Sequence, residues 1–418
     1  MAIKGSGSPM EAVDEYFDML IKSRFIEISH STDTKHVPLG SLIKPYVAQR
    51  CEDCDYPVLS ITRHQGLILQ SDRFKKEIAS RDKSQYKVIP RNVLVVAFPI
   101  DEGLLCAQQI VDNGLVSPAY KTYKIDEKIV FPRILELILR SDKSISYYLS
   151  KMRGTTLRRR TLPEEEFQSM LIDLPSMSMQ KHFIKMLEQI DVVKIICKQI
   201  FQLFDDLVKS RFNEMFGGHT ELSRWPCYSV ADVCSVKVGV VIKPAQYYTL
   251  EKDGIKTFRS LNIGENCIND KEWVYFTKEG NECNKRTVLK ENDVIVARSG
   301  LPGVACVIPK EYEGCNAVDV IIATPNTSRV NPYYLAYYTN SPHGKQQIVS
   351  RGAAQQHFNV GSYEKVTLAL PPLELQNEFV DFVKQVDKSK FEVVQSLLRL
   401  KSKYIRTETP SKRTDCDL

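Results

Sequence analysis

Basic and amide side chains beside two Arg-Gly pairs are the residues of this sequence best suited to chemistry. The densest basic cluster is Arg158-Arg159-Arg160, which follows Arg153-Gly154. Later in the chain, Arg351-Gly352 is followed by Gln355 and Gln356. Guanidinium groups bind phosphates and guanine edges, and amide side chains bond to adenine. These loops are therefore candidates for contact with nucleic acid; ordinary solvated loops remain the alternative.

Two further basic sites follow runs of residues with β propensity. Arg63-His64 comes shortly after Tyr56-Pro-Val-Leu-Ser-Ile61, and Arg298 comes after Val294-Ile-Val-Ala297. Side chains at the edge of a sheet can project into a groove of DNA. The full set of predicted DNA contacts is Arg63, His64, Arg153, Arg158, Arg159, Arg160, Arg298, Arg351, Gln355 and Gln356.

The sequence predicts no catalytic residue and no metal site. Asn331-Pro332-Tyr333-Tyr334 is like the Asn-Pro-Pro-Tyr motif of amino-methyltransferases, but it lacks the second proline, and no cofactor-binding glycine loop follows a strand. Cys51 and Cys54 have the spacing of metal ligands, but no second Cys or His pair lies nearby, and zinc usually needs four ligands. A phosphate-binding Gly-Lys-Ser/Thr loop is also absent.

Composition indicates an ordinary two-domain protein. The chain has 418 residues, 43% hydrophobic and 26% charged, with a net charge of +6 that permits a nucleic-acid partner without demanding one. No run of 18 apolar residues occurs, so we expect no membrane span and a cytoplasmic location. Residues 1–10 resemble an expression scar. The eleven cysteines are expected to be reduced.

The elements that must position these loops are repeated along the chain. Leu174-Pro175 with Gln180 and Phe183 recurs as Leu370-Pro371 with Gln376 and Phe379, at an offset of 196 (376 − 180). Phe17-Asp18 with Lys22-Ser-Arg-Phe25 recurs as Phe204-Asp205 with Lys209-Ser-Arg-Phe212, at an offset of 187 (212 − 25). A repeat this long is a tandem duplication of domains and not a solenoid.

Both repeats predict long helices with an apolar stripe. Apolar residues at 183, 186, 190, 193, 197, 200, 204 and 207 alternate by three and four, as in a coiled-coil seam. A helix over 176–216 would be about 60 Å long. It cannot be stable alone, so we expect it to pack antiparallel against a second helix over 373–403, in which Lys390 is a polar break. The expected packing residues are Phe183, Ile190, Val193, Ile200, Phe204, Phe379, Val383, Val386 and Leu397.

Between the helices lie two β-rich regions, called here the first and second heads. The fold class is therefore α/β (α+β): two mixed, β-rich heads joined by two long antiparallel coiled-coil helices, with an internal pseudo-two-fold repeat. Another possibility is that each helix packs only on its own head. The expected boundaries are an N-terminal helix at 11–29, the first head at 30–172, the central helix at 173–217, the second head at 218–369, the distal helix at 370–406 and a tail at 407–418.

These motifs resemble the specificity subunit of type I restriction-modification systems. The resemblance rests on Leu370-Pro371-Pro-Leu-Glu-Leu-Gln376, on Leu207-Val-Lys-Ser-Arg-Phe-Asn-Glu-Met-Phe-Gly217, and on Trp225-Pro226 before Val230-Ala-Asp-Val233. It extends over roughly 15–403. The first head departs from the pattern because it lacks the Trp-Pro start, and its helix begins with Pro-Ser-Met-Ser-Met-Gln.

The resemblance implies a protein without catalytic activity that takes part in phage defence. Each head would be a target recognition domain for one half of a bipartite, asymmetric sequence in double-stranded DNA. The helices would set the gap and dock two methyltransferase (M) subunits, which motor-nuclease (R) subunits join. S-adenosylmethionine, ATP and magnesium would belong to those partners, and this chain would need no cofactor.

Two alternatives stay open on sequence alone. A coiled-coil adaptor of another multi-subunit DNA-modification or phage-defence complex would also contain long helices, but diverged heads with Arg and Gln loops exceed what it needs. A self-contained methyltransferase would need some 200 further residues for a cofactor-binding fold. Two DNA half-sites that are one helical turn apart are separated by about 34–36 Å. The expected helices are long enough to hold two heads at that distance.

Overall fold

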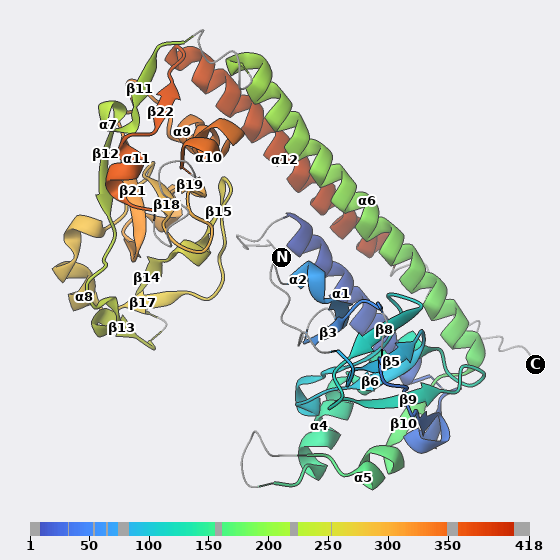
Figure 1. The fold of residues 1–418 in the computed structure, drawn as a ribbon. Coiled ribbons are helices and arrows are strands. Elements are labelled where there is room, and N and C mark those ends of the chain that lie inside the picture. Colours follow the sequence, from blue (N-terminus) through green and yellow to red (C-terminus); the bar gives the residue numbers. More distant parts are fainter. Residues whose placement is uncertain are drawn as a thin grey trace, which may run out of the picture. The chain divides into compact units, whose positions relative to one another are not determined.

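The computed structural model describes residues 9–31, 33–52, 55–63, 66–73, 83–154, 161–217, 225–251, 253–348 and 358–404 (Figure 1). The chain divides into two compact units. Phe17–Val193 is called here the N-terminal unit, and Met1–Tyr16 with Lys194–Leu418 is called the C-terminal unit. The boundary between them passes through helices α1 (Pro9–Ser29) and α6 (Met177–Phe216).

The N-terminal unit is built on a four-stranded antiparallel sheet in the order β2-β9-β6-β7. Three two-stranded sheets, β1-β10, β3-β4 and β5-β8, accompany it. The strands are β1 (Lys35–Pro38), β2 (Ile43–Pro45), β3 (Leu59–Thr62), β4 (Gly66–Leu69), β5 (Lys87–Pro90), β6 (Val93–Val96), β7 (Leu105–Ala107), β8 (Asn113–Val116), β9 (Lys121–Ile125) and β10 (Leu171–Leu174). The helices are η1 (Leu39–Ser41), α2 (Gln70–Arg73), η2 (Ile100–Glu102), α3 (Pro132–Leu139), α4 (Asp142–Lys151) and α5 (Glu164–Ser169).

The C-terminal unit repeats this plan and adds to it. Its main sheet has the order β12-β21-β18-β19, and β11 pairs with β22. A second four-stranded sheet, β13-β17-β14-β20, has no counterpart of its size among the described residues of the N-terminal unit. The strands are β11 (Cys227–Ser229), β12 (Cys234–Val238), β13 (Tyr248–Thr249), β14 (Ile255–Phe258), β15 (Ile263–Gly264), β16 (Cys267–Ile268), β17 (Val274–Phe276), β18 (Val294–Ala297), β19 (Ala305–Val307), β20 (Asn316–Ala317), β21 (Val320–Pro325) and β22 (Thr367–Ala369). The helices are α7 (Val230–Val233), η5 (Pro244–Tyr247), η6 (Ser260–Asn262), α8 (Lys278–Cys283), η7 (Lys285–Thr287), η8 (Lys310–Tyr312), α9 (Pro332–Asn340), α10 (Pro342–Ile348), α11 (Val360–Glu364) and α12 (Leu373–Tyr404).

Strand register shows that the two main sheets are copies. Val95 pairs with Cys106 in the N-terminal unit, and Ile295 pairs with Cys306 in the C-terminal unit, an offset of 200 at both positions. In β18, Val294 and Val296 enter one hydrophobic core while Ile295 and Ala297 enter another. The strand is therefore apolar on both faces because both faces are covered.

The long helices, α6 at Met177–Phe216 and α12 at Leu373–Tyr404, begin and end within one residue of the expected 176–216 and 373–403. Prolines precede both starts, and a residue before proline disfavours helix, so neither helix extends further back. Gly217 follows the end of α6 with φ 86°, a left-handed conformation that glycine adopts without strain.

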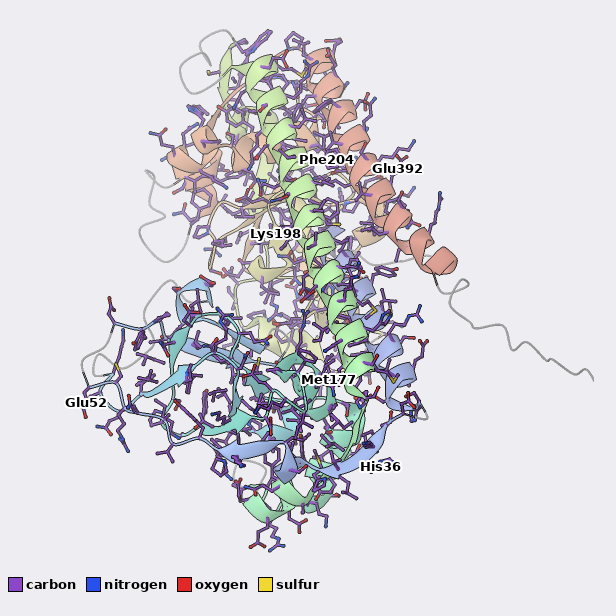
Figure 2. The ribbon with its side chains drawn as sticks, turned by 90° about the vertical axis from the view of Figure 1, so that its right-hand side faces the viewer. His36, Glu52, Met177, Lys198, Phe204 and Glu392 are labelled. Carbon is purple, nitrogen blue, oxygen red and sulfur yellow. The ribbon has the colours of Figure 1, made fainter. Side chains whose placement is uncertain are left out.

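Helices α6 and α12 lie side by side and antiparallel in the C-terminal unit. Asp205 contacts Lys390 at 2.6 Å, and Arg211 contacts Glu378 at 2.9 Å, so residue numbers fall along α6 as they rise along α12. Figure 2 shows the pair with Phe204 on one helix and Glu392 on the other. The predicted fold class, with two β-rich heads and long helices in contact, is confirmed.

The strict heptad stripe predicted for α6 is wrong toward its C-terminal end. Leu207 is 48% exposed, and the buried residues there are Phe201, Val208 and Phe212. From Phe183 to Phe212 a straight helix of 3.6 residues per turn drifts away from a 3.5-residue repeat by about 20° per heptad. The buried face therefore moves one position along the chain.

Lys390, the polar break in the predicted stripe, is paired instead of exposed. Its ammonium group lies 2.6 Å from Asp205 and 3.6 Å from Asp387. Burial raises the pKa of Asp387. A lysine whose side chain is largely buried needs such partners, because an isolated buried charge is costly.

Two expectations from composition concern membranes and cysteines. Within the described ranges, no helix is long and apolar enough to cross a bilayer.

Cys106, Cys197, Cys234 and Cys306 are free and buried, as expected. Cys51 is disulfide-bonded, so the expectation of reduced cysteines is wrong for that residue.

Candidate nucleic-acid interface

A buried glutamine fixes each head to the first turn of a long helix; we call this arrangement the glutamine clamp. In the N-terminal unit, the Gln180 side chain accepts a hydrogen bond from the Phe131 amide at 3.0 Å and donates to the carbonyls of Ile129 at 3.1 Å and Pro175 at 2.9 Å. Gln180 is 1% exposed. Because Phe131 precedes α3, the clamp joins the start of α6 to the start of a helix of the head.

The C-terminal unit contains the same clamp. Gln376 accepts from the Asn331 amide at 2.8 Å and donates to the carbonyls of Arg329 at 3.1 Å and Pro371 at 2.8 Å. The two heads are therefore mounted on α6 and α12 by matching bonds.

An aromatic contact accompanies each clamp. The rings of Phe25 and Phe183 lie 5.8 Å apart in the N-terminal unit, and those of Phe212 and Phe379 lie 5.3 Å apart in the C-terminal unit. These pairs correspond through the sequence offsets of 187 and 196. The duplication thus preserves the packing of two antiparallel helices as well as their sequence.

The clamp gives a prediction about stability. Replacing Gln376 with leucine should lower the free energy of unfolding by about 2–4 kcal/mol, because three buried backbone groups lose their hydrogen bonds. Urea unfolding followed by circular dichroism measures the change. Gln385, exposed on the same helix, provides the control, since Gln385→Leu removes no such bond. Equal midpoints for the two variants would contradict the structural role of the clamp.

The β3–β4 turn carries Arg63 and is held from behind by a charged network. Arg140 donates to the Arg63 carbonyl at 2.6 Å and to the Glu136 carboxylate at 2.9 Å. Glu136 also accepts from the Cys106 thiol at 3.0 Å. Burial, followed by the neighbouring Glu136 charge, raises the pKa of the Cys106 thiol. Arg63 itself is exposed on this fixed turn, with its side chain available to solvent.

Arg153 is exposed and lies beside an acidic residue. Its guanidinium is 3.5 Å from Glu166, which also pairs with Lys151 at 3.2 Å. The Arg153 backbone pairs with Thr161, so the ends of the intervening segment meet. A pair this exposed contributes little stability, and phosphate can compete for the arginine.

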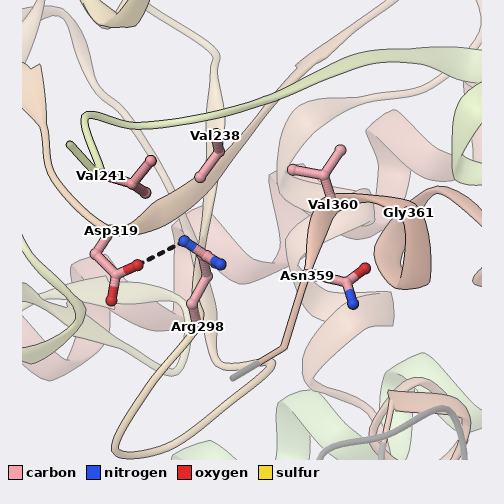
Figure 3. A pocket seen from close by; sticks show the side chains of 7 residues that line it. All are labelled: Val238, Val241, Arg298, Asp319, Asn359, Val360 and Gly361. Carbon is pink, nitrogen blue, oxygen red and sulfur yellow. Dashed lines mark hydrogen bonds and ion pairs between the residues drawn. The ribbon is translucent and has the colours of Figure 1, made fainter. Parts of the chain in front are cut away.

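Arg298 is more buried than the other described candidates. Its guanidinium donates to Asp319 at 2.5 Å and to the Phe358 carbonyl at 3.0 Å, and its side chain is 17% exposed. Together with Asp319 and Asn359 it lines an open hollow of about 490 Å³ (Figure 3). The other lining residues are Val238, Val241, Val360 and Gly361.

The hollow brings together segments that are distant in sequence. Val238 ends β12, Arg298 follows β18, Asp319 precedes β21, and Val360 begins α11. Asp319 has φ 52°, a left-handed conformation that is uncommon for residues other than glycine. This backbone places its carboxylate against the guanidinium. An arginine held in this way can present its remaining N–H groups without first losing side-chain freedom.

The other predicted contacts are His64, Arg158, Arg159, Arg160, Arg351, Gln355 and Gln356, and they lie outside the described residues. Sequence reasoning missed Asp319 and the role of the two clamp glutamines. The signal for the glutamines was the repeated Leu-Pro start with glutamine five residues after the proline. The signal for Asp319 was one acidic residue within an apolar run.

The methyltransferase-like Asn331-Pro332 pair has a structural use here. The Asn331 side-chain oxygen accepts a hydrogen bond from the Tyr333 main-chain amide at 2.9 Å and so caps α9. The Asn331 side-chain nitrogen, Nδ2, donates to the side chain of Asn377 at 2.8 Å. The Tyr334 hydroxyl is buried and donates to the Ala369 carbonyl. Within the described residues, no group of three or more His, Cys, Asp or Glu is placed to hold a metal ion.

Several solved structures are similar to the chain, and three of them align with most of it. The HsdS subunit from Thermoanaerobacter tengcongensis is 17% identical, with a TM-score of 0.36 over 88% of this chain and 92% of that one. The S subunit of a type I restriction-modification system from M. genitalium is 12% identical, with a TM-score of 0.43 over 90% and 95%. A chain from a study of complex assembly and conformational transition of the type I R-M system is 16% identical, with a TM-score of 0.42 over 90% and 95%.

One family model matches the C-terminal part of the chain. Residues 223–399, which include most of the second head, its clamp and most of α12, match the type I restriction modification DNA specificity domain. This part of the chain is therefore similar to the DNA specificity domain of type I restriction-modification systems.

Proposed function

We propose that this chain directs a type I restriction-modification complex to a bipartite, asymmetric DNA sequence. Each head, at 30–172 and 218–369, reads one half of the target in double-stranded DNA. The helices α6 and α12 set the unread gap and dock two methyltransferase subunits, which motor-nuclease subunits join. S-adenosylmethionine, ATP and magnesium act in those partners.

One observation carries the proposal: the two heads are mounted identically although their surfaces differ. Gln180 and Gln376 make corresponding bonds, whereas the second head contains an additional sheet, β13-β17-β14-β20. A common mount with different reading surfaces is what an asymmetric two-part target requires. Recognition of an identical repeat would favour identical heads.

The proposed DNA contacts differ in kind. Arg63 and Arg153 are exposed and suit phosphate, which positions a protein on DNA without specifying sequence. Arg298 is held by Asp319 and suits a base edge. The remaining predicted contacts, His64, Arg158–Arg160, Arg351, Gln355 and Gln356, are also proposed to contact DNA and lie outside the described residues.

Exchange of one head tests this division of labour. Replacing residues 37–170 with the first head of another specificity subunit should change one half of the methylated motif. The other half and the gap should stay the same, since base contacts lie in the heads. Sequencing of methylated bases in a host that expresses the chain with its partner subunits measures the result.

A deletion in the helices is the matched control. Removing four residues, about one turn, from α6 and from α12 should shorten or abolish the gap and keep both half-sites. Alteration of both half-sites by a head exchange would contradict separate reading. If the methylated sequence did not depend on this chain at all, that result would instead support an adaptor role.

A further inference from the structure

We propose that the hollow beside Arg298 reads a thymine in the half-site of the second head, with the 5-methyl group against its valines and the O4 atom accepting from Arg298. This inference rests on the proposed function and names the base that one part of the reading surface takes. Its basis is the combination of a fixed donor with apolar walls at one open site.

The donor is oriented by the protein before any DNA arrives. Asp319 and the Phe358 carbonyl bind Nη1 and Nε of Arg298. Among the described residues, nothing is hydrogen-bonded to Nη2. Figure 3 shows the guanidinium between Asp319 on one side and Asn359 with Val360 on the other. The Nη2 edge of the guanidinium therefore remains for an acceptor in the hollow that Arg298 lines.

The walls of the hollow are formed by apolar side chains, although they are partly exposed to solvent. Val241 is 46% exposed, and Val238 and Val360 are half-buried around the same opening. Leu301, on the loop that follows Arg298, is 60% exposed. Grouped exposed apolar side chains mark binding surfaces more often than isolated ones do.

Base chemistry selects thymine from the four bases. In the major groove only thymine presents a methyl group, and beside it lies the O4 acceptor. Guanine offers two acceptors but no group for the valines. Cytosine and adenine expose amino donors, which Asp319 could accept, but these leave the apolar walls unused. The donor and the valines together therefore match thymine.

The experiment uses the full chain co-expressed with its methyltransferase subunits and duplexes that carry the motif identified by methylation sequencing. Each thymine of the second half-site is replaced in turn by deoxyuridine, which removes the methyl group and keeps O4. At one position, affinity should fall roughly fourfold, the effect of one buried methyl group. Uracil in the first half-site should not reduce the affinity that this hollow contributes, because the hollow belongs to the second head.

Variants connect that position to the hollow. In Val241→Ala/Val360→Ala, thymine and uracil should bind equally at the sensitive position, whereas Val47→Ala, an exposed valine of the first head, should keep the fourfold difference. Arg298→Met should lower the affinity for duplexes with either thymine or uracil at that position. A second half-site without thymine, no uracil-sensitive position, or sensitivity that survives the valine changes would overturn the inference. A complex that binds its motif no better than a scrambled duplex would instead overturn the proposed function.

Discussion

Replacing Phe379 with alanine is expected to lower the free energy of unfolding by about 3–5 kcal/mol, the usual cost of removing a buried phenyl ring. Phe379 is fully buried, and its ring lies 5.3 Å from that of Phe212, 5.6 Å from Phe216 and 5.2 Å from Tyr337. These rings come from α6, α9 and α12, so a cavity here would loosen both the helix pair and the mount of the second head.

Urea unfolding followed by circular dichroism measures this change as a lower midpoint. The matched control is Phe391→Ala, because Phe391 lies on the same helix and is 55% exposed. Its removal should change the free energy of unfolding by less than about 0.5 kcal/mol. Similar midpoints for the two variants would show that the aromatic cluster does not hold the helices together.

Aspartate at both Leu203 and Leu207 is expected to abolish binding of methyltransferase subunits and therefore DNA methylation. Leu203 is 67% exposed and Leu207 48%, and with Ile195 and Ile196 they form an apolar stripe along α6. If a partner helix covers this stripe, two carboxylates there would be buried without partners. We expect affinity to fall by roughly 100-fold or more.

Co-purification of tagged methyltransferase subunits and methylation sequencing measure the loss. Leu203→Met/Leu207→Met keeps an apolar surface of similar volume and should bind normally. The aspartate variant should also unfold at the wild-type urea concentration or close to it, because both leucines are exposed in this chain. Normal binding by the aspartate variant would place the methyltransferase interface elsewhere.

The repeated architecture was predictable because short motifs at the helix ends survive in both copies. Prolines and glycines mark helix ends through backbone geometry, which does not depend on distant contacts. The match between Gln180 and Gln376 therefore revealed the duplication before any contact was known. The pairing of α6 with α12 followed from their length, since long amphipathic helices need a partner.

The seam and the site were less predictable because both depend on tertiary contacts. Spacing alone could not distinguish a 3.5-residue repeat from a straight helix, and Leu207 was placed on the wrong face for that reason. Arg298 was identified from its position after a strand. Its partner Asp319, 21 residues away, is brought to it only by the sheet and by a left-handed backbone.

The glutamine clamp has a consequence for how such proteins diverge. Among the described residues, every group that is hydrogen-bonded to the side chains of Gln180 and Gln376 belongs to the main chain. The head residues involved are different: Ile129 and Phe131 in one copy, Arg329 and Asn331 in the other. Because these hydrogen bonds involve only peptide groups, they do not depend on which side chains the head residues carry. Mutations can therefore accumulate over the surface of a head, or a foreign head can replace it, while the attachment to the helix stays the same. Under the proposed function, new target sequences can arise in this way without compensating changes in the helices.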